Sequence, residues 1–210
     1  MASVKKFTSS AVVNILRHNR REIENPANHD INVAKGNANY SLILEREMSD
    51  YEFFLQRKSE LYCYGRTDVK VMAGWVVTAP QDLPQEQYNA FFKTTFDFLV
   101  NRYGAQNTVQ AIVHADESGQ PHLHFCFIPA VVDRKHGGEK ICANKVLTRS
   151  ELRNFHPALQ QYLNEHGINA KVMTGVTQAQ GGNKTVKELK QARRNWTVDR
   201  QPDTVSVGRW

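Results

Sequence analysis

The stretch "TVQAIVHADESGQPHLHFCFIPA", residues 108–130, contains the pattern that decides the fold prediction. Its two ends, "TVQAIVHA" and "HLHFCFIPA", are rich in the β-branched and aromatic residues that are typical of strands. The intervening "DESGQP" has turn-forming residues but is longer than a tight turn. The stretch therefore predicts an antiparallel β-hairpin, in which core-facing and solvent-facing positions alternate along each strand.

Further strand and helix patterns lie on both sides of this hairpin. Strands are expected at residues 3–8, 40–45, 69–79 and 170–176, and helices at residues 9–24, 50–60, 84–103, 148–167 and 185–195. Gly104 provides a C-terminal stop for the helix that Pro84 opens, and "TRSE" at 148–151 is typical of a capping box. This mixture predicts an α+β fold in which helices pack on an antiparallel sheet.

The composition restricts the class of protein. The chain has 210 residues, of which 40% are hydrophobic, enough for a real core in one large domain. No run of 18 apolar residues occurs, and the N-terminal sequence lacks the apolar stretch of a signal peptide. Cys63, Cys126 and Cys142 show no CxxC spacing and are interpreted as reduced thiols of a cytosolic protein. The sequence thus argues against membrane-spanning and secreted proteins.

Positive charge gathers at the two ends of the sequence. The net charge is +6 and the isoelectric point is about 9.3. The basic residues of the two end segments are Lys5, Lys6, Arg17, Arg20 and Arg21, and then Lys184, Lys187, Lys190, Arg193 and Arg194. This distribution favours a polyanionic partner such as nucleic acid, and the alternative is a solvated basic surface.

Three histidines of the predicted hairpin form a candidate metal site. His122 and His124 are two residues apart in one strand, so their side chains share a face, and His114 ends the other strand. Cross-strand neighbours lie roughly 5 Å apart at Cβ, so the three imidazoles can converge on one ion. Such ligands suit zinc, manganese, iron, nickel or copper, and an added phosphate oxygen would favour manganese or magnesium. The alternative is a set of partly buried structural histidines.

Two carboxylates lie in the loop between the histidine-bearing strands. Asp116 or Glu117 could be a further ligand, could orient an imidazole, or could act as a general base. We prefer Glu117 because it lies deeper in the turn.

A second histidine motif, "LRHNRRE" at residues 16–22, lies in the first predicted helix. Helical spacing puts His18, Arg21 and Glu22 on one face. Glu22 could orient the His18 ring, and Arg21 could bind a phosphate through two hydrogen bonds. A neutral imidazole beside a phosphodiester is a competent nucleophile. The alternative is a solvated surface histidine.

The combined motifs resemble those of one known family. They are "LRHNRRE", "HDIN" at 29–32, "NY" at 39–40, "HADESGQPHLHF" at 114–125, "LTRSELRNFHPALQQYLNEHG" at 147–167 and "NKTVKELKQ" at 183–191. In this series, and over about residues 5–195, the chain resembles the Mob/Pre (MOBV) plasmid mobilisation relaxases. The "HLH" triplet also resembles the paired histidines of the wider HUH endonucleases.

This resemblance implies a fold and an activity. The implied fold is a five-stranded antiparallel sheet with flanking helices, like that of rolling-circle replication initiators. The implied activity is nicking of one DNA strand at a transfer origin. The protein would stay covalently attached to the 5′ phosphate, leave a free 3′ hydroxyl, and later rejoin the strand.

The resemblance also assigns roles to residues. His114, His122 and His124 would bind the metal, with Glu117 from the same motif, although the loop before the paired histidines is longer than expected. His18 would be the nucleophile, assisted by Arg21, and Tyr40 would be the rival nucleophile or a DNA contact. The DNA-binding residues would be Asn19, Tyr40, Tyr103, Lys184, Lys187, Lys190, Arg193 and Arg194, with help from Lys5 and Lys6.

The expected cofactor is Mn²⁺ or Mg²⁺, with Zn²⁺ and Ni²⁺ as other occupants. The expected partners are single-stranded and hairpin or duplex origin DNA, together with other mobilisation proteins, in the bacterial cytoplasm and without membrane contact. A relaxase catalytic domain is expected at residues 1–197, including the basic helix at 185–195. Residues 198–210 are interpreted as a tail or a linker to a C-terminal region.

Two other function classes use part of the same pattern. A metallohydrolase of small substrates would use three histidines and a carboxylate, but it would need neither the basic ends nor His18. A non-catalytic DNA-binding autoregulator would need the charge, but not the histidine cluster.

Overall fold

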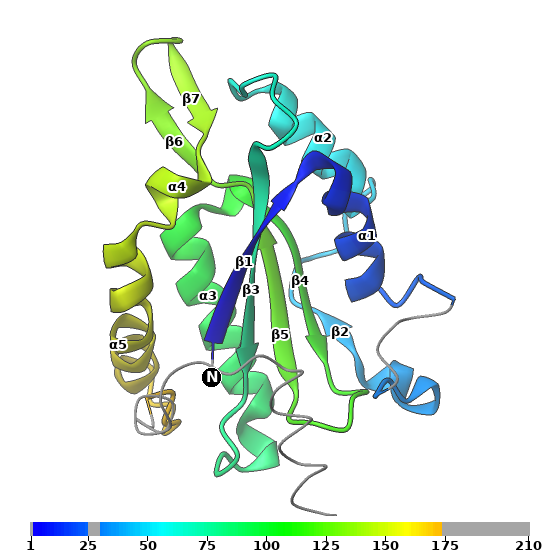
Figure 1. Cartoon of the computed structure of the whole chain (residues 1–210). Helices are drawn as coiled ribbons and strands as arrows, with labels where there is room; N and C mark the ends of the chain where they lie inside the picture. The colour runs from blue at the N-terminus through cyan, green and yellow to red at the C-terminus, as the bar shows by residue number, and fades with distance from the viewer. Residues whose placement is uncertain (1, 25–29, 174–210) are drawn as a thin grey trace, which may run out of the picture. The chain divides into compact units, whose positions relative to one another are not determined.

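The computed structural model describes residues 2–24 and 30–173, which belong to one unit (Figure 1). The predicted helix at 185–195 and the tail at 198–210 lie outside the described residues. No helix in the described part of the chain has the length and apolar character needed to cross a bilayer. Cys63, Cys126 and Cys142 are all free thiols, as predicted.

A five-stranded antiparallel sheet with flanking helices forms the centre of the unit, which confirms the predicted fold class. The strand order is β1 (Ala2–Thr8), β3 (Lys70–Thr78), β5 (His122–Phe127), β4 (Thr108–His114) and β2 (Tyr40–Ser41). The predicted hairpin is confirmed as β4 and β5, which pair in antiparallel register. The predicted strand at 40–45 is reduced to its first two residues, and residues 170–173 form no strand.

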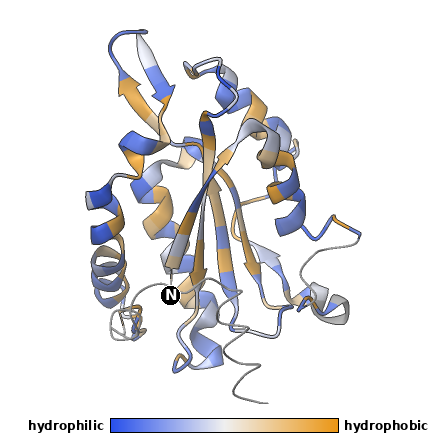
Figure 2. Ribbon diagram, in the orientation of Figure 1, coloured by the Kyte–Doolittle hydropathy of each residue, from blue (hydrophilic) through white to orange (hydrophobic). Residues whose placement is uncertain are grey.

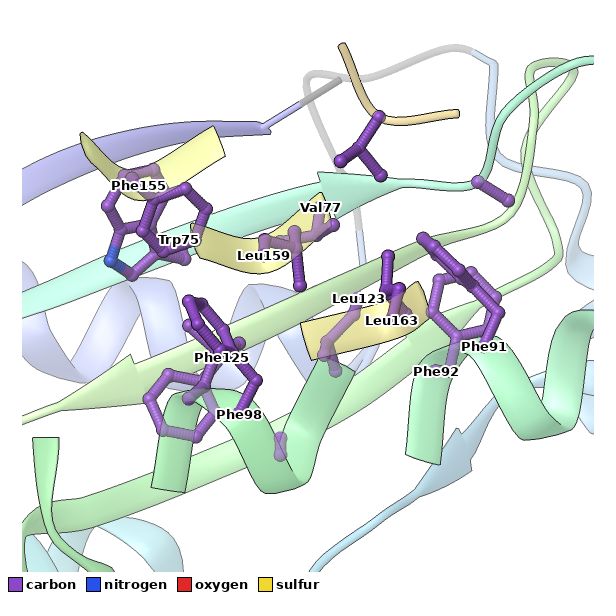
Figure 3. Close-up of a cluster of buried hydrophobic side chains, with 14 of the residues drawn as sticks. Trp75, Val77, Phe91, Phe92, Phe98, Leu123, Phe125, Phe155, Leu159 and Leu163 are labelled. Atoms are coloured by element: carbon purple, nitrogen blue, oxygen red, sulfur yellow. The ribbon is translucent and has the colours of Figure 1, made fainter. Parts of the chain in front are cut away.

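One face of the sheet is covered by α3 (Tyr88–Tyr103) and α5 (Arg149–Glu165). The strand residues that point into this layer are Ala73, Trp75 and Val77 of β3, Ala111 and Val113 of β4, and Leu123, Phe125 and Phe127 of β5. Here Trp75 stacks on Phe155 with ring centroids 3.6 Å apart. Figure 3 shows these rings among the leucines and phenylalanines of the same core. Burial of such large apolar side chains is the main stabilising contribution to a fold of this kind.

The opposite face is covered by α1 (Ser9–Asn19) and α2 (Asp50–Ser59). Every residue of β4 is therefore buried, and the expected alternation with solvent is wrong for this strand. The physical reason is that a second helical layer covers the face that an open sheet would leave to water. Hydrophobic colouring accordingly follows the central strands in Figure 2.

The helices predicted within the described residues are present, but some of them begin or end at other residues than predicted. α1 ends at Asn19 rather than near residue 24, and Arg21 follows with a φ of 60°, in the left-handed region. Gly104, with a φ of 91°, ends α3 as predicted. At the start of α5 the Thr148 side chain accepts a hydrogen bond from the backbone of Glu151, but the Glu151 carboxylate instead pairs with Arg102.

A second hairpin was not predicted. It consists of β6 (Ala130–Asp133) and β7 (Gly138–Ile141), and the short helix α4 (Ala143–Val146) follows it. Gly137, with a φ of 70°, lies in its turn, and "GG" at 137–138 is the signal that could have indicated it. In Figure 1 this hairpin lies at the end of the sheet away from the β4–β5 loop.

Candidate functional site

The three predicted metal ligands converge at the loop end of the β4–β5 hairpin. The register pairs His114 directly with His122, and His124 follows on the same face of β5. The ring centroid of His114 lies 4.4 Å from that of His124 and 5.4 Å from that of His122. One ring nitrogen from each of the three lies within 4.8 Å of those of the other two. The cluster has the ligand types and spacing of a divalent metal site with positions left for other ligands.

The hydrogen bonding of His114 tests whether the cluster suits a metal. The ring is fully buried, and its Nε2 lies 2.7 Å from the backbone carbonyl oxygen of Asn19. A carbonyl can only accept, so Nε2 carries the hydrogen and Nδ1 keeps its lone pair. That Nδ1 atom is buried and has no hydrogen-bond partner among the described residues. A buried acceptor without a partner is costly, and coordination of a metal ion would satisfy it.

Burial also sets the protonation state of the cluster. It lowers the pKa of His114 to about 4 and lowers the pKa of His124 well below its ordinary value, with the neighbouring histidines acting in the same direction. Both rings are therefore neutral near pH 7. Neutral imidazole is the form that binds metals.

His18 reaches the same site from α1. Its ring centroid lies 6.5 Å from that of His124 in an edge-to-face arrangement. Burial lowers the pKa of His18, and the positive charge of Arg21 lowers it further. The ring is thus held neutral beside the cluster of His114, His122 and His124. Glu22, expected to orient the His18 ring, makes no hydrogen bond or ion pair with it in the described part of the chain.

Arg21 joins the end of α1 to the hairpin loop. It donates two hydrogen bonds to Asp116, at 2.8 and 2.6 Å, and one of 2.9 Å to Glu117. Its expected role as a two-bond phosphate clamp is corrected, because two carboxylates occupy the Nε and Nη2 donors. Burial raises the pKa of Asp116, but the hydrogen bonds and charge of Arg21 outweigh burial and lower it overall.

The loop carboxylates take different places. Asp116 is 1% exposed and serves as the main partner of Arg21. Glu117 is partly exposed, and its Oε1 lies 3.9 Å from Nε2 of His122. Carboxylate oxygens of both residues lie within 4.8 Å of a His114 ring nitrogen. Glu117 therefore lies beside the histidine cluster, whereas Asp116 fixes the loop.

The side chains of the remaining predicted residues make their hydrogen bonds with residues outside the cluster. Tyr40 is half-buried, donates a hydrogen bond to Asn89, and pairs with Val113, which precedes His114. Asn19 is 2% exposed, and its side chain donates to Gln110. Tyr103 is buried, stacks on Phe127 and donates to Glu151. The side chains of Asn19 and Tyr103 are buried and bonded within the protein. The expectation that these two residues contact DNA is therefore corrected.

Of the lysines and arginines expected to contact DNA, the structure describes Lys5 and Lys6. Lys5 is exposed, and Lys6 donates to Asn144. The basic residues Lys184, Lys187, Lys190, Arg193 and Arg194 lie outside the described residues.

The ion pair between Arg21 and Asp116 should be measurable in the stability of the protein. We expect Asp116→Asn to lower the free energy of unfolding near pH 7 by about 2 to 3 kcal/mol, because it leaves a buried guanidinium poorly paired. The folded pKa of Asp116 is lowered, so this stabilisation is present above the ordinary value of 3.8 and is lost as the pH falls through the lower folded value. Urea unfolding at pH 7 and below pH 4 measures both effects.

The matched control is Asp68→Asn. Asp68 forms an ion pair with Arg66 in which both side chains are more than 70% exposed. Exposed pairs contribute at most about 1 kcal/mol, so this change should have little effect at any pH. Equal losses in the two variants would contradict a structural role for the buried pair.

Comparisons with known proteins agree with this geometry. The family model described as "Plasmid recombination enzyme" (Mob_Pre) matches residues 1–191. A plasmid recombination enzyme of Bacillus thuringiensis is 31% identical over 171 residues, which cover 79% of this chain and 37% of the relative. One of Lactiplantibacillus plantarum is 28% identical over 200 residues, which cover 92% of this chain and 53% of the relative. The chain thus spans roughly a third to a half of the length of these relatives.

Solved structures of a relaxase domain are also similar to this chain. A manganese-bound crystal structure of the MobM relaxase domain with plasmid oriT DNA matches with a TM-score of 0.75 and 26% identity. The match covers 91% of this chain and 97% of that one. A second manganese-bound complex of the MobM relaxase domain matches with a TM-score of 0.74 and 25% identity.

Proposed function

The chain belongs to the Mob_Pre family of plasmid recombination enzymes, and we propose that it acts as a relaxase that nicks and rejoins one DNA strand at a transfer origin. The proposed catalytic domain is residues 1–197. The observation that carries the proposal is the convergence of His18 with the metal cluster. Two motifs that are about a hundred residues apart in the sequence meet in one site, as nucleophilic attack on a bound phosphate requires.

The metal cluster suits the cofactor of this chemistry. His114, His122 and His124 would hold a divalent ion, for which we propose Mn²⁺ or Mg²⁺, with Zn²⁺ and Ni²⁺ as other occupants. Manganese is bound in the MobM relaxase structures. When bound, the ion supplies Lewis-acid withdrawal of negative charge from the scissile phosphate.

The chain's own residues perform the transfer in this proposal. The neutral His18 ring attacks the phosphorus, so a nitrogen–phosphorus bond forms and the bond to the 3′ oxygen breaks. The 3′ oxygen takes up a proton and the other ring nitrogen releases one, which leaves a phosphoramidate with the 5′ phosphate. Rejoining reverses these steps. Arg21 holds Glu117 beside the site, where this carboxylate can accept a proton.

The proposed substrate is origin DNA with a single-stranded segment at the nick. The MobM relaxase domain was crystallised with oriT DNA. Lys5, Lys6 and the basic residues of 184–194 would contact phosphates of single-stranded, hairpin or duplex DNA, and Tyr40 would contact a base near the nick. Other mobilisation proteins would be further partners. Plasmid DNA as substrate would place the activity in the bacterial cytoplasm.

A gel assay tests the proposed function. The full chain is incubated with Mn²⁺ and a labelled single-stranded oligonucleotide from the transfer origin of its own plasmid, beside a scrambled oligonucleotide. We expect an SDS-resistant adduct with the origin sequence only. DNA binding without an adduct would favour a non-catalytic autoregulator. Hydrolysis of a small phosphodiester without any adduct would favour a metallohydrolase.

A further inference from the structure

A chain of buried polar side chains joins the last turn of α1 to β4 and α2. Its centre is Gln110, which is 1% exposed and lies in a strand whose other residues are mostly apolar. Buried amides are costly unless they are hydrogen-bonded. Gln110 meets this requirement by making three contacts, to Asn19, Leu16 and Asp50.

Gln110 and His114 bind α1 at two backbone carbonyls, those of Leu16 and Asn19. They are four residues apart in β4, so they share the face that points at α1. Gln110 Nε2 donates to the carbonyl of Leu16 at 3.2 Å, and His114 Nε2 lies 2.7 Å from the carbonyl of Asn19. The Leu16 carbonyl also accepts the backbone N–H of Arg20 at 3.1 Å, so Gln110 is its second donor. The Asn19 carbonyl lies in the last turn, where carbonyls lack partners within the helix, and His114 is its donor. His18 lies between these two attachment points.

α2 closes the network from the other side. Gln110 Nε2 also donates to Asp50 Oδ2 at 2.6 Å, and Arg20 donates to both Asp50 oxygens at 2.7 and 3.0 Å. Gln110 Oε1 accepts from the Asn19 side chain at 2.8 Å. The donors and acceptor of the Gln110 amide are therefore all used, and its orientation is fixed by its neighbours.

We infer that Gln110 is a positioning residue for the reaction of His18. It lies in the core and does not act on DNA itself. Together with Asp50 and Asn19 it fixes the rotation and height of the α1 end, and hence the approach of the His18 ring to the metal cluster. The inference rests on the proposed function. Misplacement of a reacting group by about 1 Å can reduce a rate by about 100-fold, so the anchoring of one helical turn is sufficient to matter.

The first test is Gln110→Met, which keeps the size of the side chain and removes its hydrogen bonds. We expect the single-turnover rate of adduct formation, at saturating DNA and Mn²⁺, to fall by about 10- to 100-fold. The Kd for origin DNA, measured by fluorescence anisotropy, should change by less than about threefold, because Gln110 has no exposed surface to offer the DNA. Thermal unfolding followed by circular dichroism shows that both proteins are folded at the assay temperature.

Thr95→Val is the matched control. Thr95 is fully buried in α3 on the opposite face of the sheet, and its hydroxyl has no partner among the described residues. This variant should nick at the wild-type rate. A wild-type rate in folded Gln110→Met would overturn the inference, and so would an equal rate loss in both variants. Absence of any wild-type adduct would instead contradict the proposed function.

A second test exchanges the donor and acceptor roles of residues 110 and 50, and it does not depend on Gln110→Met. Gln110→Glu sets a carboxylate against Asp50 and the Leu16 carbonyl, and the rate should fall at least as far as in Gln110→Met. Adding Asp50→Asn restores a donor–acceptor pair between the two positions, and we expect about tenfold recovery of the rate. Equal rates in Gln110→Glu and the double variant would overturn the inference.

Discussion

His18→Ala is expected to abolish covalent adduct formation, with a rate loss of more than about 1000-fold, because no other group on the α1 face replaces the attacking ring nitrogen. Binding should survive: the Kd for the same oligonucleotide should change by less than about threefold, since DNA affinity depends mainly on phosphate contacts elsewhere. A denaturing gel measures the adduct, and anisotropy measures the Kd. Mass spectrometry of the wild-type adduct should place the added mass on the peptide that contains His18.

Tyr40→Phe is the matched control for this prediction. Tyr40 is the rival nucleophile, and its hydroxyl donates a hydrogen bond to Asn89 in a half-buried position. Burial raises the pKa of Tyr40, which disfavours the phenolate form that would attack. We therefore expect the Tyr40→Phe protein to keep adduct formation. Loss of the adduct in Tyr40→Phe, together with its retention in His18→Ala, would transfer the role of nucleophile to the tyrosine.

The convergence of the three histidines was predictable because its geometry is local. Spacing of two residues on a strand sets the faces of His122 and His124, and a single hairpin brings His114 opposite. The type of most other elements also followed from periodicity and from Pro and Gly signals, as for α3 and its Gly104 end. These signals act within a few residues, so no tertiary information was needed to use them.

The tertiary contacts that position the site residues could not be predicted in the same way. Nothing near Gln110 in the sequence indicates that its partners are Leu16 and Asp50, more than fifty residues away. Arg21 was expected to bind phosphate because its carboxylate partners come from a loop 95 residues further on. Tyr103 was expected to contact DNA because of the family resemblance, but it is buried and its hydroxyl donates to Glu151 of α5, which lies 48 residues further on.

Removal of the metal is expected to have an effect as large as removal of the nucleophile. Dialysis against EDTA should reduce adduct formation by more than about 100-fold, and added Mn²⁺ should restore it, because a neutral imidazole alone cannot offset the charge that develops on the phosphate. His124→Ala should cause a permanent loss of similar size. The His124 ring is close to both other rings, with centroids 4.4 Å from His114 and 4.9 Å from His122. Its loss leaves two histidine ligands, which are too few for a tight site.

The metal effect must be separated from a general effect of histidine removal. His136 provides the control, because it stacks on Tyr62 and bonds to Asp133 in the β6–β7 hairpin, away from the metal cluster. Calorimetric titration with Mn²⁺ should show one tight site in wild type and in His136→Ala, and binding weakened by more than about 100-fold in His124→Ala. Full nicking activity in metal-stripped protein would contradict the proposed role of the cluster. Unchanged Mn²⁺ affinity in His124→Ala would place the ion elsewhere, and the unpaired Nδ1 of His114 would then need another partner.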